Sequence, residues 1–177
     1  MKKIILSVIC LFALLGTAIA REPQRKPAPQ AAYPSAARNV GIGFNSQFSN
    51  VGLNGISLRY WLSDALGIEG VLGFSFGDNV RYFDLGGKIL GVLRSEQNLT
   101  LYGFGLLGME NREIKIAGTT DSDTNIFIGG GLGAEFFLQG IPNLGFGTEL
   151  GLIYNGWTED FGTFASWMPS VGVRYYF

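Results

Sequence analysis

Charged side chains that alternate with apolar ones are the first candidates for chemistry in this sequence. They are Arg59, Glu69, Asp84, Lys88, Glu135, Glu149 and Arg174. Two carboxylates at a suitable separation could act as the acid and base of glycoside hydrolysis. The chain has no His, however, so it lacks the commonest general base and metal ligand. Whether these charges catalyse a reaction or only pair with one another depends on the elements that position them.

Two short motifs resemble ligand-binding loops. Gly103 to Gly108 fits the G-x-G-x-x-G pattern of dinucleotide sites, which requires a helix to open at that point. The segment alternates like a strand instead. Asp121, Asp123 and Asn125 match the start of a calcium loop, but Ile126 takes the place of the required Gly. We therefore predict an acidic loop tip there, and no catalytic residue, cofactor or bound metal in the chain.

The N-terminal residues 1–20 have the three parts of a secretory signal peptide. Lys2 and Lys3 precede an apolar run from Ile4 to Leu15, and Ala18-Ile19-Ala20 provides small residues for cleavage. We expect the mature protein to begin at Arg21. Cys10 is the only cysteine, so cleavage would leave a chain that cannot form a disulfide.

Residues 21–38 are expected to form a disordered linker on the periplasmic side. The segment holds four of the six prolines, and its basic residues outnumber its single acid. Such a composition buries too little apolar surface to fold. An alternative interpretation is a basic tether that contacts an anionic cell-wall or lipid partner.

From Asn39 onward, apolar and polar residues alternate with a period of two. Eight segments follow this pattern: 39–48, 55–62, 66–77, 82–93, 99–109, 125–138, 144–154 and 166–177. Most are close to the roughly 9–11 residues that a tilted membrane strand needs. Short joins at 63–65, 94–98 and 139–143 alternate with joins that include two long ones, 111–124 and 155–165. These features predict an all-β fold, an eight-stranded antiparallel up-and-down transmembrane β-barrel.

The alternation also predicts which face meets lipid. Ile56, Leu58, Tyr60 and Leu62 share one face of their segment, and Arg59 lies on the other. The same separation recurs along the chain, with the charges on the face opposite the apolar residues. A soluble barrel would place its apolar face inside and its charges outside. We therefore expect a lipid-facing apolar surface and a charged lumen.

The last segment carries a pattern that resembles the C-terminal assembly signal of bacterial outer-membrane β-barrels. Its residues are Gly172, Tyr175 and the terminal Phe177. Together with Gly55–Gly70 and Gly129–Leu138, it makes residues 39–177 similar to small porin-like barrels of the OmpA/OmpX type. The resemblance implies a Gram-negative outer-membrane protein with both termini in the periplasm. Its implied partners are outer-membrane lipid and the barrel assembly machinery, and deletion of Phe177 would impair insertion but not export.

An eight-stranded barrel is only wide enough for its interior to be filled by side chains. We therefore predict that the seven charges form a salt-bridged plug, with room provided by inward Gly73, Gly86, Gly103, Gly131 and Gly147. If one turn centres on Asp64 and the next loop near Asn79, Arg59 lies opposite Glu69, and Glu69 lies beside Lys88. These three residues should then form one ladder.

The function predicted from these features is that of a non-enzymatic outer-membrane protein that displays extracellular loops. Residues 111–124 and 155–165 would contact a ligand or a neighbouring cell in adhesion, surface interaction or envelope integrity. The loops carry more acidic than basic residues, which argues against nucleic acid as a partner. Two alternatives stay open: an enzyme that modifies lipid A and a narrow, low-conductance channel.

Overall fold

The structure is a computed structural model that describes residues 39–46, 54–77, 80–116, 119–156, 161–163 and 170–177. The predicted signal peptide and linker lie outside these residues. The described part contains no helix long and apolar enough to cross a membrane. Its regular elements are strands: β1 (Val40–Ser46), β2 (Gly55–Trp61), β3 (Leu66–Phe76), β4 (Val80–Glu96), β5 (Leu99–Ile116), β6 (Thr119–Leu138), β7 (Ile141–Asn155), β8 (Phe161–Thr163) and β9 (Ser170–Tyr176).

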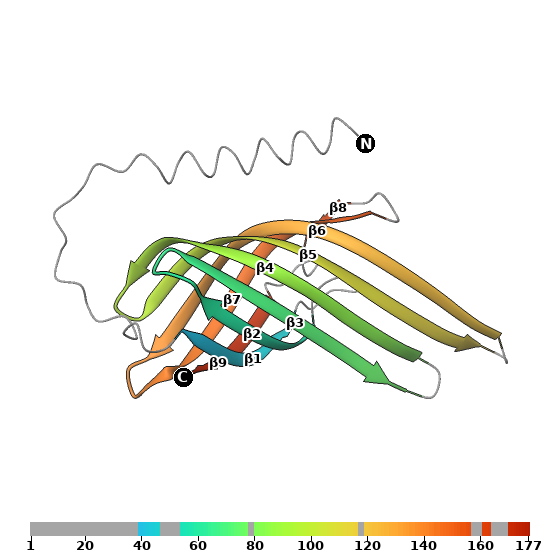
Figure 1. Cartoon of the computed structure of the whole chain (residues 1–177), viewed down its shortest axis with the longest axis horizontal. Coiled ribbons are helices and arrows are strands. Elements are labelled where there is room, and N and C mark those ends of the chain that lie inside the picture. The colour runs from blue at the N-terminus through green and yellow to red at the C-terminus, as the bar shows by residue number, and fades with distance from the viewer. Residues whose placement is uncertain (1–38, 47–53, 78–79, 117–118, 157–160, 164–169) are drawn as a thin grey trace. The chain divides into compact units, whose positions relative to one another are not determined.

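The strands form one antiparallel sheet that closes on itself (Figure 1). Each of β1 to β7 pairs with the next in sequence, and β9 joins β1 to β7. The short β8 and β9 pair with the same edge of β7, at residues 152–154 and 144–149 respectively. They therefore serve as two pieces of one barrel strand. The prediction of an eight-stranded antiparallel barrel is confirmed.

Tight turns connect strands at one rim. The Ser63 hydroxyl accepts hydrogen bonds from the amides of Ala65 (3.3 Å) and Leu66 (3.2 Å), which fixes the β2–β3 turn. Turns at 97–98 and 139–140 join β4 to β5 and β6 to β7 at the same rim. The Phe177 amide donates to the Val40 carbonyl at 2.9 Å, so the first and last strands of the barrel also meet at this rim.

The predicted long loop at 111–124 is wrong. β5 continues to Ile116 and β6 begins at Thr119, so nearly all of that segment is a β-hairpin. Polar residues lie on both of its faces, and only Ile114 and Ile116 alternate with charged residues, which is too short a run to reveal the strands. Of the second predicted loop, Asn155 ends β7 and Phe161–Thr163 form β8. Residues 157–160 and 164–165 lie outside the described part.

The exposed apolar side chains gather on the outer face of the described strands. On β3, for example, Ile68, Leu72, Phe74 and Phe76 are exposed, whereas Glu69 and Val71 between them are buried. On β6 this outer apolar surface runs from Ile126 to Leu138 and ends where Thr124 replaces an apolar residue. In water such a surface would be costly, so it indicates a lipid environment.

Candidate functional site

The predicted charged ladder lies in the lumen, with the predicted register. Arg59 on β2 is opposite Glu69 on β3, and Glu69 is opposite Lys88 on β4. Glu135 on β6, Glu149 on β7 and Arg174 on β9 approach from the remaining wall. All six residues are at most 2% exposed. Alternation places them inside, and closure of the sheet brings residues that are far apart in sequence into contact.

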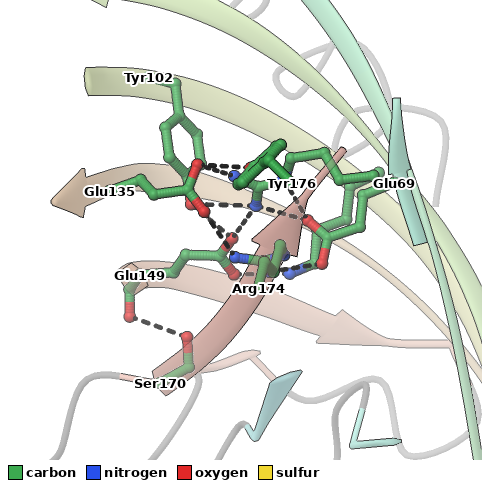
Figure 2. Close-up of polar contacts among 9 residues, drawn as sticks. Glu69, Tyr102, Glu135, Glu149, Ser170, Arg174 and Tyr176 are labelled. Atoms are coloured by element: carbon green, nitrogen blue, oxygen red, sulfur yellow. Dashed lines mark hydrogen bonds and ion pairs between the residues drawn. The ribbon is translucent and has the colours of Figure 1, made fainter. Parts of the chain in front are cut away.

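Arg59 and Arg174 are joined through two shared carboxylates. Glu69 Oε2 accepts from Arg59 Nη2 at 2.5 Å, and its other oxygen, Oε1, accepts from Arg174 Nη2 at 2.5 Å. Glu135 repeats the arrangement, with Oε2 3.1 Å from Arg59 Nη1 and Oε1 3.3 Å from Arg174 Nη1. Figure 2 shows Glu69, Glu135 and Arg174 pointing toward one another from different walls of the barrel.

Lys88 does not form the predicted ion pair with Glu69. Its Nζ reaches across the lumen to Glu149 Oε2 at 2.6 Å. Glu149 Oε1 also lies 3.5 Å from Arg59 Nη2. The register of the ladder was right, but both oxygens of Glu69 are occupied by arginines. The lumen is narrow enough for the long Lys88 side chain to reach a partner on the opposite wall.

Two tyrosines complete the network, and the sequence analysis missed both. The Tyr102 hydroxyl donates to Glu149 Oε1 at 3.0 Å and accepts from Arg59 Nη2 at 3.2 Å. The Tyr176 hydroxyl donates to Glu135 Oε2 at 2.7 Å. Tyr176 lies two residues after Arg174 and therefore also faces the lumen. The alternation could have revealed this tyrosine. Tyr102 could not be found that way, because both faces of β5 are apolar near it.

Asp84 is not part of this network, contrary to the prediction. It faces inward and is 3% exposed, but the ion pairs among the described residues do not include it. Its register partner on β5 is Glu110 rather than a cation. Without Asp84, three cations and three carboxylates make the network neutral. We call these six residues, with Tyr102 and Tyr176, the lumen network.

Glycines make room for the long side chains of the lumen network. A Cβ at Gly145 would lie 3.0 Å from Glu135 Oε1, and one at Gly147 would lie 3.1 Å from Arg174 Nη1. A Cβ at Gly133 would collide with the ring of Tyr102. Gly103, predicted to face inward, is opposite the exposed Leu132 and so faces outward. Its neighbours Tyr102 and Phe104 occupy the lumen instead.

An apolar layer adjoins the lumen network. Val71, Phe104, Leu106, Phe127 and Ile153 are buried together with Leu90 and Tyr102. Lys88 Nζ lies 5.5 Å from the centre of the Phe104 ring, which gives the ammonium a cation–π contact beside its ion pair. Side chains therefore fill this part of the barrel. In the described residues, no three His, Cys, Asp or Glu side chains are grouped as metal ligands would be.

The residues of the predicted assembly signal lie on both faces of the last strand. Gly172 faces the lumen, and Tyr175 and Phe177 face outward. The rings of Tyr175 and Phe177 are in edge contact, with centroids 5.1 Å apart. Phe177 is 61% exposed on the outer apolar surface. Its recognition by the assembly machinery stays a prediction.

Comparison with solved structures identifies the fold. The N-terminal β-barrel domain of Pseudomonas aeruginosa OprF matches with a TM-score of 0.59 and 15% identity, covering 79% of this chain and 96% of that one. Neisserial surface protein A matches with a TM-score of 0.47 and 17% identity, over 79% and 94% of the two chains. Ail of Yersinia pestis matches with a TM-score of 0.43 and 18% identity, over 79% and 97%.

Among sequence comparisons, no family model matches the chain. No curated protein matches it either. The class of protein is therefore defined by the fold and by the two faces of its strands. The chain has the eight-stranded antiparallel β-barrel fold of small outer-membrane proteins, with a lumen filled by its own side chains.

Proposed function

We propose that this protein is a non-enzymatic outer-membrane barrel that holds the β5–β6 hairpin outside the cell for contact with a surface partner. The observation that carries the proposal is the point at which the outer apolar surface ends. Met109 and Ile126 are the last apolar outward residues of the two strands, and they are opposite each other. Beyond them, seven residues of each strand (110–116 and 119–125) continue as a paired ribbon.

Both faces of this ribbon carry polar residues, and Ile114 is an apolar exception on the inner face. On the outward face, Asn111 Nδ2 donates to Thr124 Oγ1 at 2.7 Å, where a lipid-facing pair would be apolar. On the other face, Arg112 is opposite Asp123. At about 3.3 Å per residue the ribbon is roughly 20 Å long. Figure 1 shows β5 and β6 running together past the ends of β1 and β2.

The charges of the ribbon restrict its partner. Glu110, Glu113, Asp121 and Asp123 outnumber Arg112 and Lys115. A net negative ribbon repels nucleic acid and sulfated sugars, and it favours a neutral or basic protein surface. The part of the lumen that the lumen network fills supports neither a channel nor a substrate cavity, because the six charged groups of that network are bound to one another.

Single-cysteine labelling tests the proposal. The mature chain is expected to lack cysteine, so Ser122→Cys in the ribbon and Ser95→Cys at the opposite rim can each be labelled alone. A membrane-impermeant maleimide added to intact cells should label Ser122→Cys and not Ser95→Cys. Permeabilised cells should show labelling of both.

Labelling of Ser95→Cys alone in intact cells would contradict the proposed orientation, including the periplasmic position of both termini. The role of the ribbon is tested by replacing residues 112–123 with a two-residue turn. Cells with the shortened hairpin should assemble the barrel normally but lose adhesion to the target surface. Unchanged adhesion would contradict the proposed display function.

A further inference from the structure

An acidic row crosses three strands at the level where the outer apolar surface of β5 and β6 ends. Asp84 on β4 is opposite Glu110 on β5, and Glu110 is opposite Asn125 on β6. Cross-strand partners point to the same face, and the buried Asp84 shows that this face is the inner one. The three side chains are therefore neighbours on the inner wall, outside the lumen network.

Two buried oxygen atoms in this row have no partner. Asp84 Oδ1 and Asn125 Oδ1 are inaccessible to solvent and accept no hydrogen bond. Asp84 accepts one hydrogen bond from the backbone of Asn54, but that leaves Oδ1 unsatisfied. Asp84 as a whole is 3% exposed. Burial of an oxygen without a partner is costly, and these two side chains flank the carboxylate of Glu110.

The row also lacks positive charge. The negative charges of Asp84 and Asp123 both disfavour the ionised form of Glu110. The positive charge of Arg112 favours that form. Arg112 is itself opposite Asp123 in the next row. The cations of the lumen network already form ion pairs with Glu69, Glu135 and Glu149. Like charges on adjacent strands destabilise a sheet unless a counter-charge lies between them.

We propose that Asp84, Glu110 and Asn125 bind a calcium ion. Carboxylate and amide oxygens are the ligands that this hard cation takes, and its flexible geometry suits donors from three strands with water in the remaining positions. Two carboxylates and one amide predict a weak site, with a dissociation constant of roughly 0.1–1 mM, as in extracellular modules. The bound ion would stiffen the base of the hairpin. This proposal does not depend on the surface partner.

The site differs from the calcium loop that the sequence suggested. Asp121, Asp123 and Asn125 lie at alternate positions of β6, where a strand spreads them along one face instead of wrapping them around an ion. Only Asn125 belongs to the proposed site. The other ligands come from neighbouring strands.

Terbium luminescence tests the site in the mature chain refolded in non-ionic detergent. Tyr82 is the inward-facing residue next to Asp84 on β4, so it is placed to sensitise a bound Tb³⁺. The wild type should bind one Tb³⁺ per chain, and calcium should displace it more effectively than magnesium. Glu110→Gln and Asp84→Asn should each weaken binding about tenfold or more.

The matched control is Glu113→Gln. Glu113 is on the same strand but opposite Arg81 on the outward face, so its substitution should leave Tb³⁺ binding unchanged. Asn125→Asp adds a carboxylate at constant size and should strengthen binding. Because one variant could fail to fold, the urea midpoint of the wild type is also measured with calcium or with NaCl at equal ionic strength. Calcium alone should raise it.

Three results would overturn the proposal. The first is the absence of saturable Tb³⁺ binding to the wild type. The second is an equal loss of binding in Glu113→Gln and Glu110→Gln. The third is a Glu110→Gln variant that is more stable than the wild type while calcium leaves the wild type unchanged. That result would mean that Asp84 and Glu110 relieve their repulsion by holding a proton between them.

Discussion

Glu69 connects the two arginines of the lumen network, so its removal leaves two buried cations short of a partner. Breaking a buried ion pair typically costs about 3–5 kcal/mol. We expect Glu69→Ala to lower the free energy of unfolding by roughly that amount in lipid vesicles, measured by urea titration. Arg174→Ala in the Glu69→Ala background should then cost less than it does alone, because the 2.5 Å pair is already lost.

The matched comparison is Lys88, which is also a register neighbour of Glu69 but forms its ion pair with Glu149. A double-mutant cycle between Lys88 and Glu69 should show a smaller coupling than the cycle between Arg174 and Glu69. Equal coupling in the two cycles would mean that adjacency in register, rather than the observed pairing, sets the energetics.

Gly133 tests how tightly the lumen network is packed. A methyl group there would overlap the Tyr102 ring, which cannot move freely because its hydroxyl is bound by Arg59 and Glu149. We expect Gly133→Ala to cost about 1–3 kcal/mol in vesicle unfolding. Gly70→Ala is the control, because a Cβ at Gly70 meets nothing within 4 Å. A similar cost for both variants would show that lost glycine flexibility, not packing against Tyr102, is responsible.

The sequence predicted which charges face the lumen better than it predicted their partners. Arg59 and Glu69 stand out because apolar residues flank them on a half-polar strand. Around Gly103 both faces of β5 are apolar, so alternation wrongly placed Gly103 inside the barrel. For the same reason Tyr102 was missed. The pair between Lys88 and Glu149 depends on the width of the closed barrel, which no local pattern encodes.

At the scale of elements, the strands of the barrel were predicted where one face is apolar. Alternation located β2, β3 and β7 because lipid and lumen select different residues on their two faces. It failed between Asn111 and Thr124, where polar residues lie on both faces of the hairpin and alternation is limited to Glu113–Ile116. There the sheet is continued by backbone hydrogen bonding between β5 and β6 rather than by burial of an apolar face.

The last strand allows assembly to be separated from stability. Phe177 faces outward and contacts Tyr175, while its amide bonds to Val40. Phe177→Ser keeps that backbone bond, so we expect a small change in the unfolding free energy of refolded protein. If the ring is read by the assembly machinery, the amount of folded, heat-modifiable protein in cells should fall several-fold.

Ile42→Ser is the control for Phe177→Ser. Ile42 is opposite Tyr175 and also lies on the outer apolar surface, but it is not part of the assembly signal. Its substitution should leave cellular assembly near the wild-type level. Equal assembly defects in the two variants would assign the effect to general loss of apolar surface.

At the scale of the whole molecule, the barrel has its apolar face outside and its charges inside. This inversion could be predicted from sequence, because it depends only on which residues share a face. Closure and the partners across the lumen could not, since they require all strands to be in register at once. The protein is stable in this arrangement only if lipid covers the outer apolar surface.

The most direct test of that arrangement is a charge placed on the outer apolar surface. Leu132 lies midway along the apolar part of β6 and is 57% exposed. Leu132→Arg should lower the free energy of unfolding in lipid vesicles by about 2–4 kcal/mol, as expected at a bilayer midplane. Ser122→Arg, on the same face of the same strand but beyond the apolar surface, should change it by less than about 0.5 kcal/mol. If Leu132→Arg is as silent as Ser122→Arg, the outer surface does not face lipid, and the protein is not a membrane-spanning barrel.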